Sequence, residues 1–321
     1  MQDVNMKNRD ALFALINDNK KLKTVEMAPI LSSYRSTIFD DNNLKSILWT
    51  IETKMSDDTR FSSLKSAIEK NFNAYLWEIQ KMYDENVKIL AYFDTEYPSK
   101  LKTIKNPPFT LFHKGKLLDF SKCIAIVGTR NLSHYGHKKT REISGELASK
   151  KFTIVSGLAR GVDTEAHCGA LDANGKTIAV LPGDIFNIYP QENESLSRDI
   201  VENGAILSDI SPLEKLTKLR FIERNRITSG LADCIVIIET MESGGTFQQV
   251  NVAKEQGKKI FVLYPRERDV DSLKGFNKLV SLGAEPFESV DTIINFLNNP
   301  KLASINKKIV QNLSLFNIKN D

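Results

Sequence analysis

The sequence predicts an α/β protein, a doubly wound and mostly parallel sheet, with a small helical domain in front of it. Two observations support this fold class. From Cys123 onward, short apolar runs rich in β-branched residues alternate with segments of helical spacing. Before residue 85 the apolar residues recur only at helical spacing. Buried strands that alternate with amphipathic helices form a parallel sheet covered on both faces.

The strand and helix predictions follow the chain in order. Two strands are expected early, at 87–93 and 109–113, separated by proline-containing turns. Later strands are expected at 123–127, 152–155, 177–181, 205–208, 233–239 and 259–263. The helices between them are expected at 137–150, 162–174, 192–203, 219–231 and 246–256.

Three segments divide the chain. Residues 1–85 are expected to form the helical domain, because 10–16 and 63–77 place apolar residues three or four apart. Residues 86–300 are expected to form the sheet domain, and 301–321 a C-terminal tail. The helical domain carries no recognisable chemistry, and its amphipathic helices fit either core packing or recruitment of a partner.

Composition excludes several classes of protein. Hydrophobic residues are 41% and charged residues 26%, which is typical of a soluble globular protein. No apolar run approaches the ~20 residues of a membrane span, and the N-terminus lacks the apolar core of a secretory signal. We therefore expect a cytoplasmic protein without membrane contact. The three cysteines have no metal-ligand spacing, so no metal and no cofactor are expected.

Several predicted strands end in loops that suit an anionic ligand. The carboxyl ends of parallel strands meet at one edge of a sheet, and ligands bind there. Glycines permit close backbone approach, helix N-termini present free N–H groups, and arginine binds phosphate in bidentate fashion. The candidate phosphate-binding residues of these loops are Gly128, Thr129, Arg130, Ser156, Gly157, Arg160, Tyr189, Asn193, Gly244, Gly245 and Thr246.

A cationic helix precedes the predicted strand 233–239. Arg224, Asn225 and Arg226 lie side by side in it and are expected to form one wall of the same pocket. The net charge of +4 is mild, so the placement of arginines matters more than the total. Aromatic side chains near the edge could stack on bases, and the candidates are Phe186, Tyr189 and Phe247.

A second interpretation is a nucleotide-binding sensor or nucleotide hydrolase. The loop Ser243-Gly244-Gly245-Thr246 favours it. A hydrolase requires a general base, whereas the residues that follow this loop include Gln248 and Gln249, and an amide cannot act as a general base. Glu239 and Glu242 are the possible substitutes. Binding without turnover fits better, so no catalytic residue is expected.

The order of these motifs resembles the DprA/Smf family of DNA-processing proteins. The resemblance covers about residues 86 to 265, and the segments that carry it are Tyr92-Phe-Asp-Thr-Glu-Tyr-Pro98, Ile126-Val-Gly-Thr-Arg130, Ile154-Val-Ser-Gly-Leu-Ala-Arg-Gly-Val-Asp163, Gly175-Lys-Thr-Ile-Ala-Val-Leu181, Tyr189-Pro190 and Glu223-Arg-Asn-Arg-Ile-Thr-Ser-Gly-Leu231. One position departs from the family, because Gln191 stands where a basic residue is usual after Tyr-Pro.

The resemblance implies an extended Rossmann-like domain that binds single-stranded DNA without base specificity. It also implies a cytoplasmic homodimer that helps to load a RecA-type recombinase during natural transformation, with no established catalysis. Arg130, the Ser156–Arg160 loop and Arg224-Asn225-Arg226 match the family's binding pocket. The extra glycine of the Ser243–Thr246 loop is similar to the related phosphoribohydrolase (LOG-like) branch, which keeps open the nucleotide interpretation and a role in a defence system.

Overall fold

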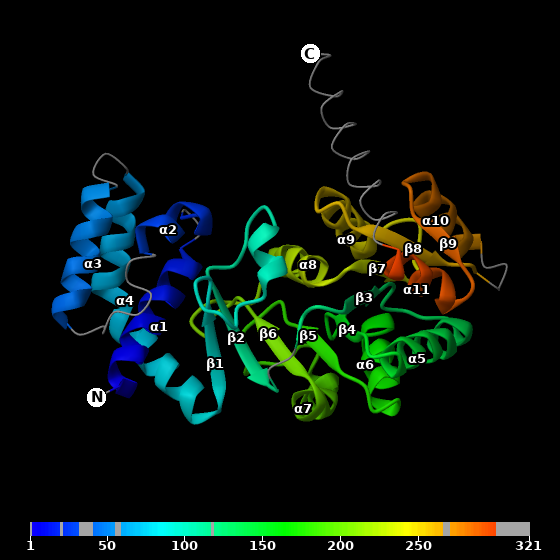
Figure 1. The fold of residues 1–321 in the computed structure, drawn as a ribbon, viewed down its shortest axis with the longest axis horizontal. Coiled ribbons are helices and arrows are strands. Elements are labelled where there is room, and N and C mark those ends of the chain that lie inside the picture. The colour runs from blue at the N-terminus through cyan, green and yellow to red at the C-terminus, as the bar shows by residue number, and fades with distance from the viewer. Residues whose placement is uncertain are drawn as a thin grey trace, which may run out of the picture.

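The structure is a computed structural model, and it describes residues 2–19, 22–31, 41–54, 59–116, 119–265 and 270–299. The predicted tail at 301–321 lies outside these residues. Figure 1 shows a group of helices at one end of the molecule and a large sheet flanked by helices beside it.

The N-terminal segment is helical, as predicted. It contains α1 (Gln2–Asp18), α2 (Thr24–Leu31), α3 (Asp41–Lys54) and α4 (Thr59–Asp84). Phe13 of α1 packs edge-on against Phe109, with ring centroids 5.1 Å apart. The hydrophobic cluster around Phe13 also includes Leu181 and Ile200 of the sheet domain. The helical segment therefore shares a hydrophobic core with the sheet, which α1 and α4 contact directly.

The described residues form one nine-stranded sheet in the order β1-β2-β6-β5-β4-β3-β7-β8-β9. The strands are β1 (Val87–Ala91), β2 (Thr110–Gly115), β3 (Cys123–Val127), β4 (Thr153–Ser156), β5 (Thr177–Val180), β6 (Ala205–Ser208), β7 (Cys234–Ile237), β8 (Lys259–Leu263) and β9 (Glu285–Phe287). A mostly parallel sheet was predicted and is confirmed. The seven neighbouring strands β6-β5-β4-β3-β7-β8-β9 all pair in parallel.

Two features of the sheet were not predicted. The early strands join the main sheet as an antiparallel edge, with β1 on β2 and β2 on β6. The strand order also reverses at β3, because β4, β5 and β6 follow on one side of it and β7, β8 and β9 on the other. Such a reversal is a topological switch point, where loops leave the sheet in opposite directions and open a crevice at its carboxyl edge.

The helices cover both faces because side chains alternate along each strand. Ile124 and Ile126 face α5 (His134–Ser149), α6 (Val162–Asp172) and α11 (Val290–Asn298). Ala125 and Val127 face α9 (Gly245–Glu255) and α10 (Val270–Ser281). The remaining helices are α7 (Glu194–Asn203) and α8 (Lys218–Leu231), with the short 3₁₀ segments η2 (Ser99–Thr103) and η3 (Gln191–Asn193).

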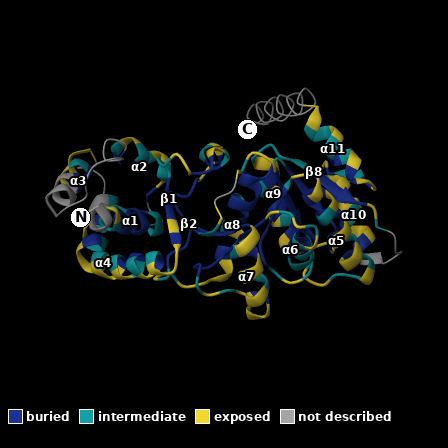
Figure 2. Cartoon of the chain, turned by 60° about the horizontal axis from the view of Figure 1, so that its bottom comes forward, coloured by how far each residue is buried: buried dark blue, intermediate teal, exposed yellow. Residues whose placement is uncertain are grey.

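Figure 2 shows buried residues concentrated in the strands and on the inner faces of the helices, while the outer faces of α5 and α7 are exposed. The predicted strands and helices from residue 123 to 263 match the structure to within a few residues. The elements α10, β9 and α11 were not predicted. In β9 the strand signal is weak, because it has only three residues and one of them is a proline. Within the described ranges, no helix is long and apolar enough to cross a membrane.

Candidate functional site

A cavity of about 610 Å³ opens at the topological switch point. It lies between the loops that follow β3 and β7, one side of α8 and the N-terminal turn of α9. The residues that line it are Val127, Gly128, Thr129, Arg130, Ala159, Asp163, Tyr189, Lys218, Phe221, Ile222, Arg224, Asn225, Thr228, Thr240, Met241, Ser243, Gly244, Gly245, Thr246, Gln248 and Gln249. We refer to this space as the cavity.

Two helices begin at the cavity without a side-chain cap. Thr217 precedes α8 and Gly244 precedes α9. Neither residue provides a side chain that accepts a hydrogen bond from a backbone N–H group of the first turn. Gly244 has a φ of +134°, a backbone conformation that requires glycine. The first N–H groups of both helices are thus left for a ligand, and the positive ends of two helix dipoles favour an anion.

Arg130 and two aromatic rings form one rim of the cavity. The guanidinium carbon of Arg130 lies 5.5 Å from the centroid of the Phe221 ring. Tyr189 meets the same ring edge-on at 5.6 Å and is 49% exposed. A cation held over one ring and beside a second exposed ring can contact a phosphate while the exposed ring stacks on a base.

Arg224 forms the floor of the cavity. Its side chain is only 8% exposed, and its Nη1 donates a hydrogen bond to the Val180 carbonyl at 2.9 Å. The guanidinium lies directly against Gly157, where a Cβ atom would overlap Nη1. Glycine at 157 is therefore required by the arginine, and any larger residue must displace the guanidinium.

Asp163 is the carboxylate that interacts electrostatically with Arg224. Its Oδ2 accepts hydrogen bonds from the backbone N–H of Gly157 at 3.1 Å and of Ala159 at 3.3 Å. Burial raises the pKa of Asp163, and the Arg224 cation partly offsets that rise. The carboxylate thus fixes the loop that precedes α6, whose capping residue is Gly161.

His167 lies beneath the same floor and is fully buried. The Thr177 hydroxyl donates to the Ile154 carbonyl, so His167 Nδ1 donates to the Thr177 oxygen at 2.7 Å. Burial, aided by the Arg224 charge, lowers the pKa of His167 to about 3. This histidine therefore stays neutral and is a packing residue.

The floor also presents polar atoms without partners. Among the described residues, Arg224 Nε and the Thr228 hydroxyl are buried and have no hydrogen-bond partner. Gln249 is almost fully buried, and its Nε2 donates to the Asn225 carbonyl at 3.3 Å. An unpaired buried polar group lowers the stability of the fold, so the floor of the cavity is stabilised when a polar ligand supplies the missing hydrogen bonds.

Nine of the predicted binding residues line the cavity together. They are Gly128, Thr129, Arg130, Tyr189, Arg224, Asn225, Gly244, Gly245 and Thr246. They come from loops up to about a hundred residues apart in sequence, and the switch point brings them to one place.

Four predicted residues from the loops after β4 and β5 lie outside the cavity wall. The Ser156 hydroxyl is buried and donates to the Ile126 carbonyl at 2.7 Å, and Gly157 lies beneath Arg224. Asn193 donates to the Leu158 carbonyl and the Thr164 hydroxyl, both at 2.9 Å. These contacts position the loop that supports the cavity. The fourth residue, Arg160, has a different role.

Arg160 points into solvent instead of the cavity. Its side chain is 62% exposed and forms a bidentate ion pair with Glu192, at 2.6 and 2.8 Å. The loop that precedes α6 turns Arg160 outward because the adjacent Gly161 has a φ of +75° and lies close to the Thr129 carbonyl.

Arg226 lies on a different side of α8 from Arg224. Its Nη2 pairs with Asp209 at 2.6 Å and its Nε donates to the Asn106 carbonyl at 2.8 Å. Two residues along a helix turn the side chain by about 200°. The expectation that Arg224 and Arg226 form one wall is therefore wrong, because only one of them can face the cavity.

The same helical period identifies a residue that was missed. Lys218, Phe221, Asn225 and Thr228 recur at three or four residues and all line the cavity. Phe221 was present in the cationic stretch, and spacing alone could have placed it beside Arg224. Of the predicted stacking residues only Tyr189 lines the cavity; Phe186 packs beneath Lys81 and Lys114, and Phe247 beneath Lys278.

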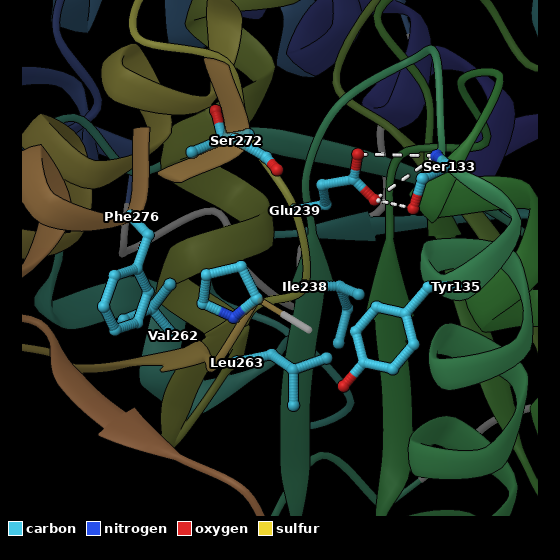
Figure 3. A pocket seen from close by; sticks show the side chains of 10 residues that line it. Ser133, Tyr135, Ile238, Glu239, Val262, Leu263, Ser272 and Phe276 are labelled. Carbon is cyan, nitrogen blue, oxygen red and sulfur yellow. Dashed lines mark hydrogen bonds between the residues drawn. The ribbon is translucent and has the colours of Figure 1, made fainter. Parts of the chain in front are cut away.

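Glu239, the possible substitute base, is engaged elsewhere. Figure 3 shows its carboxylate turned toward Ser133 at the start of α5. It accepts hydrogen bonds from the Ser133 hydroxyl at 2.9 Å and from the Ser133 N–H at 3.3 Å. Glu239 and Ser133 line a small pocket of their own (Figure 3), which has a volume of only about 20 Å³. Within the described ranges, no group of three or more His, Cys, Asp or Glu side chains is arranged to hold a metal ion.

Comparison with known proteins identifies relatives of this chain. DNA processing protein DprA of Bacillus subtilis is 32% identical over 249 residues, which cover 77% of this chain and 84% of that protein. DNA processing protein A of Streptococcus pneumoniae superposes with a TM-score of 0.72 at 27% identity, over 90% of this chain and 95% of that chain.

A further structure, DNA processing protein A of Helicobacter pylori, has a TM-score of 0.59 and 32% identity, over 66% of this chain and 95% of that one. That protein has a single-stranded DNA binding mode. The sequence profile of DNA recombination-mediator protein A matches residues 88–298, which is more than half of the chain. This protein therefore belongs to the DNA recombination-mediator protein A (DprA/Smf) family.

Proposed function

We propose that the protein binds single-stranded DNA in the cavity, without regard to base sequence. The observation that carries the proposal is the meeting of two uncapped helix N-termini with Arg130 and the buried Arg224. These groups attract phosphates, and phosphate contacts convey no base identity. The rings of Tyr189 and Phe221 add stacking that tolerates any base.

The family relationship supports a wider role for this binding. Relatives in Bacillus and Streptococcus are DNA processing proteins. We propose that the protein acts in the cytoplasm as a homodimer and helps to load a RecA-type recombinase during DNA uptake and recombination. Tyr264, Leu273 and Val280, which are exposed apolar residues at the α10 end of the sheet, suit a contact between two copies.

We propose that the cavity binds without catalysis. Gln248 and Gln249 line it where a nucleotide hydrolase requires a carboxylate, and an amide cannot accept a proton from water. Glu239 is held by Ser133. Release of free base from nucleoside monophosphates would contradict this view and favour the nucleotide hydrolase.

The test compares two arginines that differ in position. Arg130→Ala is expected to weaken single-stranded DNA binding about tenfold and to lower the log–log salt slope by about 0.7, the contribution of one phosphate contact. Arg160→Ala removes an exposed arginine outside the cavity and serves as the matched control. Gel shifts with single- and double-stranded DNA at two salt concentrations measure both effects. The same proteins are run on a sizing column in parallel.

Equal affinities for the wild-type protein, Arg130→Ala and Arg160→Ala would contradict DNA binding in the cavity. A preference for double-stranded over single-stranded DNA would contradict the substrate class.

A further inference from the structure

A second and larger depression, of about 990 Å³, lies on the other side of α8 and at the C-terminal end of α9. It reaches the amino ends of β3, β7 and β8 and is bordered by η2 and the end of α11. We call it the basic groove, after its cationic residues Lys100, Lys105, Lys122, Arg226, Lys258 and Lys259.

Four of these cations have partners that explain their positions. Lys100 pairs with Asp233, Lys259 with Glu285 and Arg226 with Asp209, each at 2.6 Å. Lys258 donates to the Ala232 carbonyl at the end of α8, where a cation stabilises the helix dipole. Each of these contacts is a structural use of the charge.

Lys105 and Lys122 have no such use. Both side chains are exposed, and among the described residues no carboxylate pairs with either of them. The groove also contains Glu223, Asp233 and Glu255, of which Asp233 pairs with Lys100 and Glu223 with Arg220. Arg226 and Lys259 pair with carboxylates outside the lining, so Lys105, Lys122 and Lys258 remain against one carboxylate, Glu255. An excess of positive charge in a depression attracts a polyanion, and two unpaired lysines leave charge available for it.

The groove is not uniformly polar. Phe152 and Phe296 line it, and both rings are only partly buried. Lysines beside partly exposed rings along a groove are typical of surfaces that bind single-stranded nucleic acid, because phosphates meet the cations while bases meet the rings.

The groove continues the cavity along the same two helices. The cavity and the groove lie on different sides of α8, and Ile222 lines both. On α9 the cavity takes the first turn and the groove the last. A strand that leaves the cavity over Ile222 therefore crosses α8 and enters the groove on its other side.

We propose that single-stranded DNA held in the cavity extends over Ile222 into the basic groove, where Lys105 and Lys122 contact its phosphates. This inference rests on the proposed function of the cavity. It adds a second segment to the binding track and assigns a role to two lysines that no motif marks.

The test uses oligothymidylates of two lengths, because a short strand fills the cavity alone. The double variant Lys105→Gln/Lys122→Gln is expected to bind a strand of about six nucleotides as the wild-type protein does. It is expected to bind a strand of about 20 nucleotides about tenfold more weakly, with a salt slope lower by about 1.4, or two phosphate contacts. Lys54→Gln/Lys70→Gln, in α3 and α4, removes the same charge from the helical segment and is the control.

The outcomes separate the two proposals. The groove proposal is overturned, while the cavity proposal stands, in either of two cases. In the first, the groove variant binds both strands as tightly as wild type or weakens equally for both lengths. In the second, the control variant loses as much affinity for the long strand as the groove variant does. If the wild-type protein binds neither length, or if Arg130→Ala binds both as tightly as wild type, the cavity proposal itself fails. Fluorescence anisotropy of labelled strands measures all four proteins.

Discussion

The cavity and the basic groove are built on the same two helices but hold charge in different ways. In the cavity, Arg224 is buried against Gly157 and hydrogen-bonded to the Val180 carbonyl, and the helix N-termini belong to the folded backbone. In the groove, Lys105 and Lys122 are exposed on flexible side chains. A fixed charge costs nothing to orient when a ligand arrives, whereas a lysine side chain must be ordered.

This contrast separates the charges on which the fold depends from those that serve binding alone. Removing a buried charge alters the folded state itself, because its neighbours were arranged around it. Removing an exposed lysine alters only the ligands that the surface attracts. Variants in the cavity floor should therefore change stability and binding together, while variants at the surface change binding alone.

The largest expected effect is that of Arg224→Ala. It leaves the buried Asp163 carboxylate without its neighbouring cation and should lower the free energy of unfolding by about 3 kcal/mol. Arg198→Ala, on α7, breaks an exposed pair with Glu194 and should cost about 0.5 kcal/mol or less. Urea unfolding of both variants measures the difference, and equal losses would remove the distinction between floor and surface.

The pH dependence of stability probes the same floor. His167 has a pKa of about 3 in the folded protein and about 6.5 when unfolded, so only the unfolded chain takes up a proton between these values. Its contribution is complete above pH 6.5 and is lost as the pH falls toward 3. Between pH 7 and pH 5 the loss should be about 2 kcal/mol.

His167→Gln removes this term while keeping a donor for the Thr177 hydroxyl oxygen. Buried carboxyls such as Asp18, whose pKa burial raises to about 7, shift stability in the opposite direction, but they are present in both proteins and cancel in the difference. Urea unfolding of both proteins at pH 7 and pH 5 measures that difference. If the wild type and His167→Gln lose the same stability between the two pH values, His167 is not held neutral by burial.

The smallest expected effect comes from Gln191→Lys at the rim. Gln191 is exposed in η3, two residues after Tyr189, where the family usually has a basic residue. The lysine should tighten single-stranded DNA binding about threefold and steepen the salt slope by about 0.7. Gln191→Glu, which has almost the same size as glutamine, should weaken the binding of single-stranded DNA. If affinity is the same in all three proteins, this rim lies off the path of the strand.

Much of the site could be predicted from local sequence because it consists of the residues directly after each strand. A strand of known direction places its next residues at a known edge, so Gly128–Arg130 and Gly244–Thr246 were assigned to one side of the sheet. Arg160 and Asn193 were assigned there too, but the structure turns the first outward and uses the second to hold a loop. Side-chain direction within a loop depends on backbone angles that residue type alone does not determine.

Local sequence was enough to predict the alternation of strands and helices, the edge of the sheet at which the cavity opens and the family. These follow from short-range periodicity and from the residues that succeed each strand. The reversal of strand order at β3, the antiparallel edge of β1 and β2, and the choice of Arg224 over Arg226 emerged only from the folded chain. Those features depend on contacts between distant segments, such as Gly157 against Arg224, which local spacing does not encode.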